Sequence, residues 1–318
     1  MKTDHYQCEK CGTLIQGTSS PSSHGCPKSF PHKWHKLGAV GTKNHQCRKC
    51  GTVVATDNTP SSHGCPNGFP HQWQAVDYLS SGTEFDADFG HVSGMTWLPW
   101  VGSRFGSRPH DQRLLVVGES HYAKPSSPDQ LAKVIQDHID YKPYTRDVVS
   151  ECLVHQDWPN RTLDTLPKLL FGTSSIDRQR VWSDTGYYNF VQRLMHYNRE
   201  GQPERPTWDD FVLGWQVFSD IVRILRPSHC VFIGVAAANS FDYALRALGH
   251  AHTPVQRTVY ISRTQGRRAS ITLDGHTTDI AFVQHLGKFF SWSQWHSYLR
   301  THHPELTSWL DAQRYTTN

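Results

Sequence analysis

Six of the eight cysteines lie before residue 66, in a pattern that suits metal binding. They form two groups with the same internal spacing: Cys8, Cys11 and Cys26 in the first, and Cys47, Cys50 and Cys65 in the second. Two thiolates separated by two residues can bind one tetrahedral metal ion, and further ligands from a distant turn close the site. Cysteines crowded at one end of a chain are not distributed like a disulfide framework, so we predict two metal sites.

The two groups belong to a duplicated segment. Residues 5 to 38 superpose on residues 44 to 77 after a shift of 39 positions, and each copy reads C-x2-C-G, then P-S-S-H-G-C-P, then F-P-H-x-W. A unit of about 34 residues has too few apolar side chains to fold alone, so bound metal must supply much of its stability. We therefore predict zinc ribbons at residues 1–39 and 40–78, with two zinc ions per chain.

The fourth ligand of each site has two candidates, because two histidines of the repeat are duplicated. His24 precedes Cys26 by two residues, whereas His32 follows it by six, far enough for the chain to turn back toward the metal. We favour His32 in the first copy and the equivalent His71 in the second. His24 and its counterpart His63 remain the alternatives.

The charge of the duplicated segment does not identify its binding partner. Residues 1 to 77 contain eight Lys and Arg against four Asp and Glu. Each Cys3His zinc site would lower this balance by about one charge. Such a weakly basic surface fits contact with nucleic acid, but it also fits an ordinary solvated face or a protein partner. Trp34 and Trp73 could stack on bases, although one large aromatic side chain in so small a unit is more often its core.

Two acid-base candidates follow apolar segments of strand length farther along the chain. Glu119 comes directly after residues 114–118, and His285 comes two residues after residues 280–283. In sheets with parallel strands, functional loops gather at the carboxyl ends of the strands. We therefore expect Glu119 and His285 at the same edge of one sheet.

Helices and strands alternate through this part of the chain. The patterns predict strands at 114–117, 230–235 and 280–283, and helices at 208–225 and 236–248. Such alternation is typical of crossover connections between parallel strands. We predict a three-layer α/β domain with a mostly parallel central sheet at residues 79–318.

Length and composition fit one large domain beside two small units. The chain has 318 residues, of which 37% are apolar, enough for one ordinary core. The first ten residues are polar, and no apolar stretch approaches the roughly 20 residues of a membrane span. We expect a cytoplasmic, monomeric protein that does not enter a membrane.

Four segments of the large domain resemble motifs of the uracil-DNA glycosylase superfamily, in the same order. L-L-V-V-G-E-S-H-Y at 114–122 is similar to its first strand and water-positioning loop, and G-Y-Y-N-F-V-Q at 186–192 to the segment whose Asn reads the base. R-P-S-H-C-V-F-I-G-V-A-A at 226–237 is similar to its central strand, and F-V-Q-H-L-G-K-F-F-S-W at 282–292 to its last motif. The resemblance runs from about residue 98 to residue 299. The repeats similarly resemble a tandem zinc-ribbon module at the N-termini of bacterial proteins.

The resemblance implies roles for individual residues. Glu119 would orient or deprotonate water, His285 would stabilise the departing base, and Asn189 would read the base edge. The remaining residues expected to contact the base or DNA are Ser120, His121, Tyr122, Lys288 and Phe289. A cationic cluster suited to phosphate consists of Arg263, Arg267 and Arg268. The structural alternatives are a loop-capping carboxylate, an ordinary histidine and a turn-forming asparagine.

Two departures from the superfamily pattern affect what the resemblance implies. Ser120 stands where uracil-excising members place an Asp, and Leu286 and Gly287 replace the usual Pro-Ser. The resemblance therefore does not identify the base. Some members hold an iron-sulfur cluster with four cysteines, but this domain has only Cys152 and Cys230, so we expect none.

Together these observations predict a hydrolase. The expected activity is that of a DNA glycosylase that removes a modified or damaged pyrimidine, in repair or in defence against phage with modified DNA. The alternative is a non-catalytic reader of modified bases whose ribbons recruit DNA or protein. Glu119 distinguishes the two hypotheses, because a reader needs no acid beside the sugar.

Overall fold

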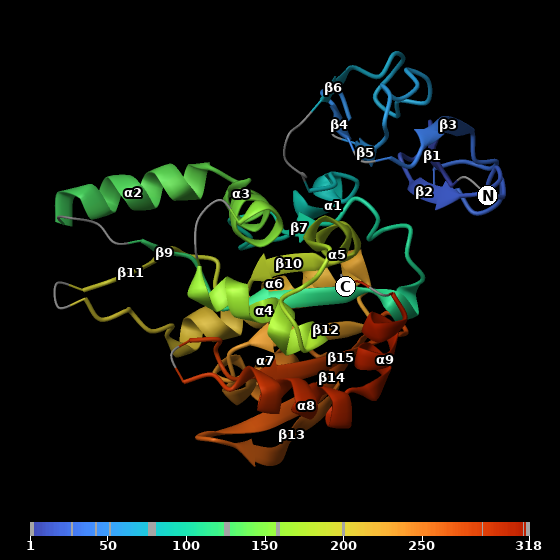
Figure 1. Cartoon of the computed structure of the whole chain (residues 1–318). Coiled ribbons are helices and arrows are strands. Elements are labelled where there is room, and N and C mark those ends of the chain that lie inside the picture. The colour runs from blue at the N-terminus through green and yellow to red at the C-terminus, as the bar shows by residue number, and fades with distance from the viewer. Residues whose placement is uncertain are drawn as a thin grey trace.

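A seven-stranded mixed sheet forms the centre of the protein (Figure 1). The computed structural model describes residues 3–26, 28–41, 43–50, 52–75, 81–123, 128–156, 160–198, 201–287, 289–313 and 315. Within these ranges, no helix is long and apolar enough to cross a membrane. The predicted α/β class is confirmed.

The central sheet is parallel in its middle and antiparallel at both edges. In spatial order its strands are β13 (Ala251–Ile261), β14 (Thr264–Leu273), β15 (His276–Val283), β12 (His229–Ile233), β8 (Leu114–Gly118), β10 (Gly186–Asn189) and β7 (Trp100–Val101). The four strands from β15 to β10 are parallel to one another. The expected mostly parallel sheet is therefore correct for the middle only.

The antiparallel edge arises from two tight turns. β13, β14 and β15 follow one another directly, and short connections can join only antiparallel strands. Asp274 and Gly275 both have positive φ, 49° and 74°, in the turn between β14 and β15. An Asp-Gly pair between two strand-like segments is a readable hairpin signal, so this edge was predictable from the sequence.

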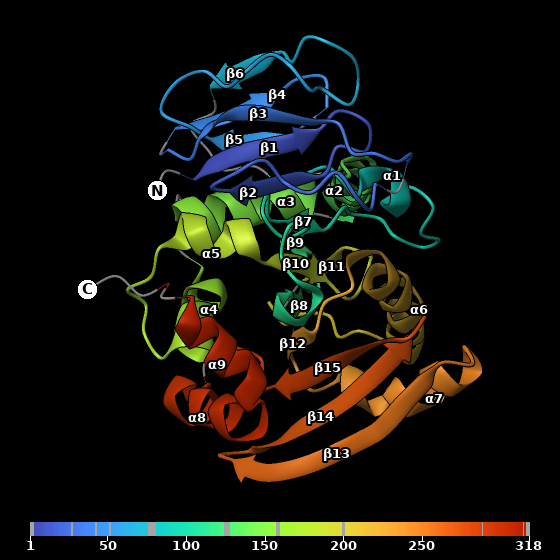
Figure 2. The ribbon, with the colours of Figure 1, turned by 90° about the vertical axis from the view of Figure 1, so that its right-hand side faces the viewer.

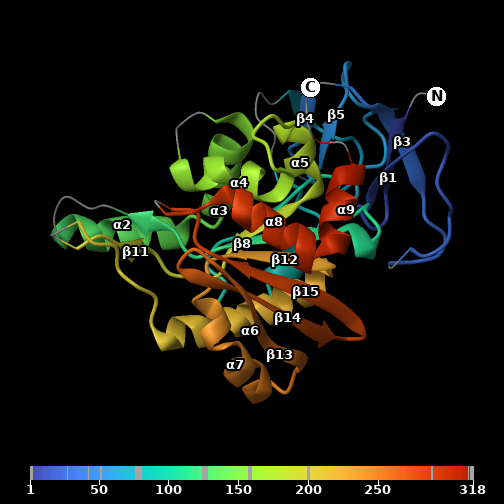
Figure 3. The same ribbon diagram turned by 60° about the horizontal axis from the view of Figure 1, so that its bottom comes forward.

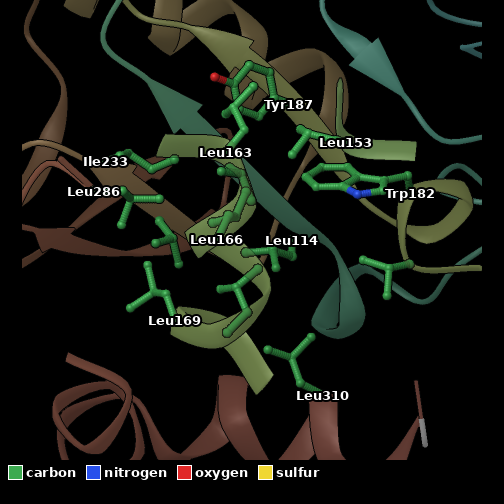
Figure 4. Packing of buried hydrophobic residues seen from close by; sticks show 14 of the residues in the cluster. Leu114, Leu153, Leu163, Leu166, Leu169, Trp182, Tyr187, Ile233, Leu286 and Leu310 are labelled. Carbon is green, nitrogen blue, oxygen red and sulfur yellow. The ribbon is translucent and has the colours of Figure 1, made fainter. Parts of the chain in front are cut away.

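Helices cover both faces of the sheet and complete three layers (Figure 3). One face packs against α6 (Trp208–Leu225) and α7 (Phe241–Ala247). The other face packs against α4 (Arg161–Phe171), α8 (Trp292–His302) and α9 (Pro304–Ala312). Because side chains alternate along a strand, Leu114 of β8 faces one layer and Leu115 the other. Figure 4 shows Leu114 beside the leucines of α4.

The remaining elements are short or lie at the margins. They are α1 (Asp86–Phe89), η1 (His110–Gln112), β9 (Tyr122–Ala123), α2 (Pro128–Asp140), α3 (Tyr144–Val148), η2 (Val149–His155), α5 (Arg178–Asp184), β11 (Met195–His196) and η3 (Ala237–Asn239). β9 and β11 form a separate parallel pair. Figure 1 shows α2 extending away from the main body.

The predicted elements of the large domain are largely confirmed. The helix expected at 208–225 is α6, which begins with a capping box between Thr207 and Asp210. The helix expected at 236–248 is divided into η3 and α7 at Ser240, whose buried Oγ accepts a hydrogen bond from Trp215 Nε1 at 3.0 Å. This hydrogen bond holds the break between η3 and α7 against Trp215, a buried residue of α6.

The two N-terminal repeats each form a three-stranded antiparallel sheet. The first contains β1 (Asp4–Cys8), β2 (Leu14–Gly17) and β3 (Trp34–Ala39), and the second contains β4 (Asn44–Cys47), β5 (Val53–Ala55) and β6 (Trp73–Ala75). Figure 2 shows them side by side on the side of the large domain where β7 lies.

The repeats pack against each other and against the large domain. His5 Nε2 lies 2.9 Å from the carbonyl of Ala55, so the first repeat is hydrogen-bonded to the second. Thr83 Oγ1 of the large domain donates to the carbonyl of Cys50 at 2.9 Å. Val53 is buried in the same apolar cluster as one face of the central sheet. The repeats are thus joined to the domain through side chains as well as through the chain.

Candidate functional site

Each repeat brings its predicted Cys3His set together. The ligand atoms within each set all lie within 4.8 Å of one another, in the groups Cys8, Cys11, Cys26, His32 and Cys47, Cys50, Cys65, His71. Backbone hydrogen bonds shape the C-x2-C turn, where Gly12 N donates to the carbonyl of Cys8 at 2.9 Å. His32 N donates to the carbonyl of Ser23 at 2.7 Å, which turns the chain back toward the cysteines. These groups could hold metal ions.

The ligand separations suit a tetrahedral ion. Cys11 Sγ lies 3.6 Å from His32 Nδ1, and Cys50 Sγ lies 3.6 Å from His71 Nδ1. Bonds of about 2.3 Å to sulfur and 2.0 Å to nitrogen at tetrahedral angles place the two ligand atoms about 3.5 Å apart. His24 instead lies 3.2 Å from Ser22 Oγ, outside the Cys3His group. The geometry therefore favours His32 over His24.

Trp34 and Trp73 support the ligand histidines. Trp34 stacks on His32 with ring centroids 4.6 Å apart, and Trp73 stacks on His71 at 4.5 Å. The Trp34 Nε1 group donates to the carbonyl of Ser22 at 2.7 Å, and Trp73 makes the equivalent bond at 2.8 Å. One face and the N–H edge of each half-buried ring are thus used within the fold, which supports a role in a miniature core.

The catalytic candidates meet at one edge of the central sheet. Gly118 of β8 pairs with Asn189 of β10, and Ile233 of β12 pairs with Val283 of β15. Because these strands are parallel, the loops that follow them emerge on the same side. Glu119 and His285 therefore lie at the same edge of the sheet, as predicted, with the end of β12 between them. Asn189 ends β10, directly beside β8.

His285 lies close enough to Glu119 to be affected by its negative charge. Burial lowers the pKa of His285, the negative charge of Glu119 raises it in part, and Arg205 lowers it again. The residue as a whole is nevertheless exposed to solvent. With its pKa below the usual value of about 6.5, His285 is neutral at pH 7 and can donate a hydrogen bond through one ring N–H.

Tyr122 fixes the Glu119 carboxylate. Its hydroxyl donates to Glu119 Oε2 at 3.1 Å and lies 3.4 Å from the carbonyl of Glu204. Burial, followed by the nearby Glu119 charge, raises the pKa of Tyr122, so the phenol stays protonated as a donor. Tyr122 thus orients Glu119, which the sequence did not predict.

Asn189 is held in a buried position at the end of β10. It is 4% exposed, and its Oδ1 accepts a hydrogen bond from Tyr187 at 3.2 Å. Gln192 Nε2 donates to its carbonyl at 2.6 Å. A Cβ atom on Gly118 would lie less than 3.0 Å from both Asn189 Oδ1 and the Tyr187 hydroxyl. Glycine is therefore required where the Glu119 loop passes Asn189.

The Gly118→Ala variant should be destabilised and should displace Asn189. The added methyl group meets two buried side chains, so we expect the free energy of unfolding to fall by about 1–3 kcal/mol. Urea denaturation measures this change. Gly90→Ala is a matched control, because its φ is −59° and a Cβ there would lie 3.3 Å from its nearest neighbour, the carbonyl oxygen of Ala87. Equal stability of the two variants would contradict the tight packing of Asn189 on Gly118.

The loop after Glu119 differs in part from expectation. Ser120 Oγ donates to the carbonyl of Arg193 at 2.8 Å, so it holds two loops together. His121 is 6% exposed, lies 2.8 Å from Thr145 Oγ1, and packs edge-on against Trp97. Burial, and then His138, lower the pKa of His121 to about 3. The expectation that His121 contacts DNA is therefore wrong, because the ring is enclosed in the core and uncharged.

The last loop is only partly described. Phe289 is 61% exposed, and the Arg263 guanidinium lies over its ring at 5.1 Å. Lys288 lies outside the described residues. Leu286 is buried beneath the loop and anchors it to the core (Figure 4).

The three arginines do not form one cluster. Arg267 and Arg268 are adjacent on β14, so their side chains lie on opposite faces of the sheet. Arg267 Nη1 donates to Asn239 Oδ1 at 2.6 Å, near the end of β12, whereas Arg268 Nε donates to Gln256 at 2.9 Å. Of these three arginines, Arg263 and Arg267 remain candidates for phosphate contact on the side of the sheet edge where His285 lies.

Sequence reasoning missed the segment that carries Arg205 to the site. Arg193 makes a two-bond ion pair with Asp210, at 2.7 and 2.8 Å, and a further bond of 2.7 Å to Glu204. These bonds fix residues 204–210 beside Tyr122 and bring the charge of Arg205 near His285. The Thr207 capping box was readable in the sequence, but the ion pairs were not.

Comparison with known proteins adds no relative. No protein-family model matches the sequence, and no curated protein matches it significantly. The functional argument therefore depends on the residues and their geometry.

Proposed function

We propose that the protein is a DNA glycosylase that hydrolyses the N-glycosidic bond of a modified or damaged pyrimidine. The observation that carries this proposal is that Glu119, Asn189 and His285 all lie at the carboxyl ends of parallel strands in one sheet, with only β12 between the strand before His285 and the strand before Glu119. An acid, an amide and a neutral imidazole in one place match the requirements of base excision. The motif resemblance supports the same reaction.

In this mechanism Glu119 acts on water and on the sugar. Its carboxylate, held by Tyr122, orients a water molecule toward C1′ and offsets the positive charge that develops on the sugar. The bond from C1′ to the base nitrogen breaks, and a bond from C1′ to the water oxygen forms. Glu119 accepts the proton that water loses.

His285 and Asn189 act on the base. The neutral His285 ring donates a hydrogen bond to the base oxygen that gains negative charge as the bond breaks. Asn189 Oδ1 is engaged by Tyr187, so its NH2 group is the part that we assign to the base edge. Arg205 adds a positive charge near the departing base.

We further propose that the metal in both repeats is zinc. Three thiolates and one imidazole are a characteristic zinc ligand set, and four protein ligands leave no position for a substrate. The sites are therefore assigned a structural role. Two zinc ribbons would then stand beside the glycosylase domain.

A direct assay tests the glycosylase proposal. Purified protein is incubated with labelled oligonucleotides that each carry one modified pyrimidine, and abasic sites are scored by alkaline cleavage. Strand cleavage at one or more modified positions is the expected result. Tight binding to a modified base with no cleavage would instead identify a reader of modified DNA.

A further inference from the structure

Both repeats carry an exposed aromatic ring outside their folding core. Phe30 is 68% exposed and Phe69 is 66% exposed, at equivalent positions of F-P-H-x-W. Each ring lies beside the exposed histidine of P-S-S-H-G-C-P: the ring centroids of His24 and Phe30 are 5.3 Å apart, and those of His63 and Phe69 are 5.1 Å apart. We name each His and Phe pair a tip.

The two tips share residues that belong neither to the metal ligands nor to the buried core. Three exposed neighbours of the tips differ between the copies, at Lys28 and Asn67, Ser29 and Gly68, and Lys33 and Gln72, whereas the exposed Pro31 and Pro70 are the same. Metal ligation accounts for the identity of His32 in both copies, and core packing accounts for that of Trp34. Neither reason applies to His24 or Phe30, which are exposed and lie outside the ligand group. A repeated exposed aromatic ring indicates a binding surface.

The charge around the tips favours an anionic partner. Residues 18–36 and 58–75 contain no Asp or Glu. Lys49 Nζ lies 3.5 Å from the carbonyl of Phe69, which places a cation at the second tip. Glu9, a nearby carboxylate of the first repeat, is paired with Lys33 at 2.7 Å. A polyanion can therefore approach both tips without meeting an unpaired acid there.

A histidine ring of the first repeat lies next to the second tip. His63 lies against His35 with ring centroids 6.4 Å apart and planes inclined by 15°. Phe69, His63 and His35 thus form a row of three rings across the contact between the repeats. Successive aromatic rings beside cations suit the stacking of successive unpaired bases.

We infer that the tips bind the unpaired bases of single-stranded DNA. Phe30 and Phe69 supply the stacking faces, and Lys49, which lies beside Phe69, supplies a cation for phosphate. The inference deepens the proposed function, on which it rests for the choice of DNA, by naming single-stranded DNA as the substrate class. It assigns the repeats to DNA and not to a protein partner.

Binding of unmodified oligothymidine to the zinc-loaded full chain tests the inference. Because base stacking on one aromatic ring contributes about 1–3 kcal/mol, we expect Phe30→Ala and Phe69→Ala each to raise Kd about tenfold and the double variant about a hundredfold. Fluorescence anisotropy of a labelled oligonucleotide gives these values. Two zinc ions per chain in every variant show that the repeats remain folded.

Conservative variants separate stacking from general apolar contact. Phe30→Trp and Phe69→Trp keep a flat ring and should bind like the wild type, whereas Phe30→Leu and Phe69→Leu should bind as weakly as the alanine variants. Wild-type affinity in the double alanine variant, or in the leucine variants, would overturn the inference. The oligonucleotide carries no modified base, so these results do not depend on excision. If the protein excises a modified base but the tip variants bind oligothymidine as tightly as the wild type, only the assignment of the tips to DNA is refuted. The proposed function then stands.

Discussion

The Glu119→Gln variant should bind DNA that carries the modified base as the wild type does, yet excise the base at least about 10²-fold more slowly. Glutamine keeps the size of the side chain and can still accept the hydrogen bond from Tyr122. It removes the negative charge that activates water and offsets the developing sugar cation. Single-turnover excision and binding of the same oligonucleotide measure the two effects separately.

Two further variants show that the loss reflects this chemistry. His285→Ala should slow excision of every base, because His285 acts on charge that develops in any leaving group. Asn189→Ala should change the preference among bases, because it leaves one base edge unpaired. An excision rate in Glu119→Gln equal to the wild-type rate would place the catalytic acid elsewhere.

The second large effect concerns the metal sites. His32→Ala should reduce the zinc content from two ions to one per chain, because the first repeat loses a ligand that lies 3.6 Å from Cys11 Sγ. Structural zinc contributes an apparent free energy of about 10–16 kcal/mol in small domains, so the first repeat should unfold. Elemental analysis measures the zinc, and protease sensitivity of residues 3–41 measures the unfolding.

The duplicated histidine provides the matched control for this variant. His24→Ala should keep both zinc ions and the protease resistance, because His24 lies outside the ligand group. Loss of zinc in His24→Ala with retention in His32→Ala would reassign the fourth ligand. Absence of zinc from the wild-type protein would refute the zinc assignment for both repeats.

Local patterns in the sequence were sufficient for the metal groups and for the main elements. The ligands of each group lie within 25 consecutive residues, and the same spacing occurs in both repeats. They can therefore be found without knowing which distant segments pack together. The helix at 208–225 has a strong helical periodicity, and the strand at 114–118 is a continuous apolar segment that ends at a glycine. Short apolar segments and the alternation of helices and strands also indicated that Glu119 and His285 follow parallel strands.

Only the tertiary structure decided which neighbours these residues have. His121 and Tyr122 are adjacent in the sequence, yet one is enclosed between Trp97 and Thr145 and the other holds Glu119. Arg205 reaches His285 from 80 residues away through the ion pairs of Arg193. Such contacts depend on long-range packing and on desolvation, which a pattern of residue types does not encode. The sequence therefore determined the chemistry available in each segment, and the fold determined which segments share a site.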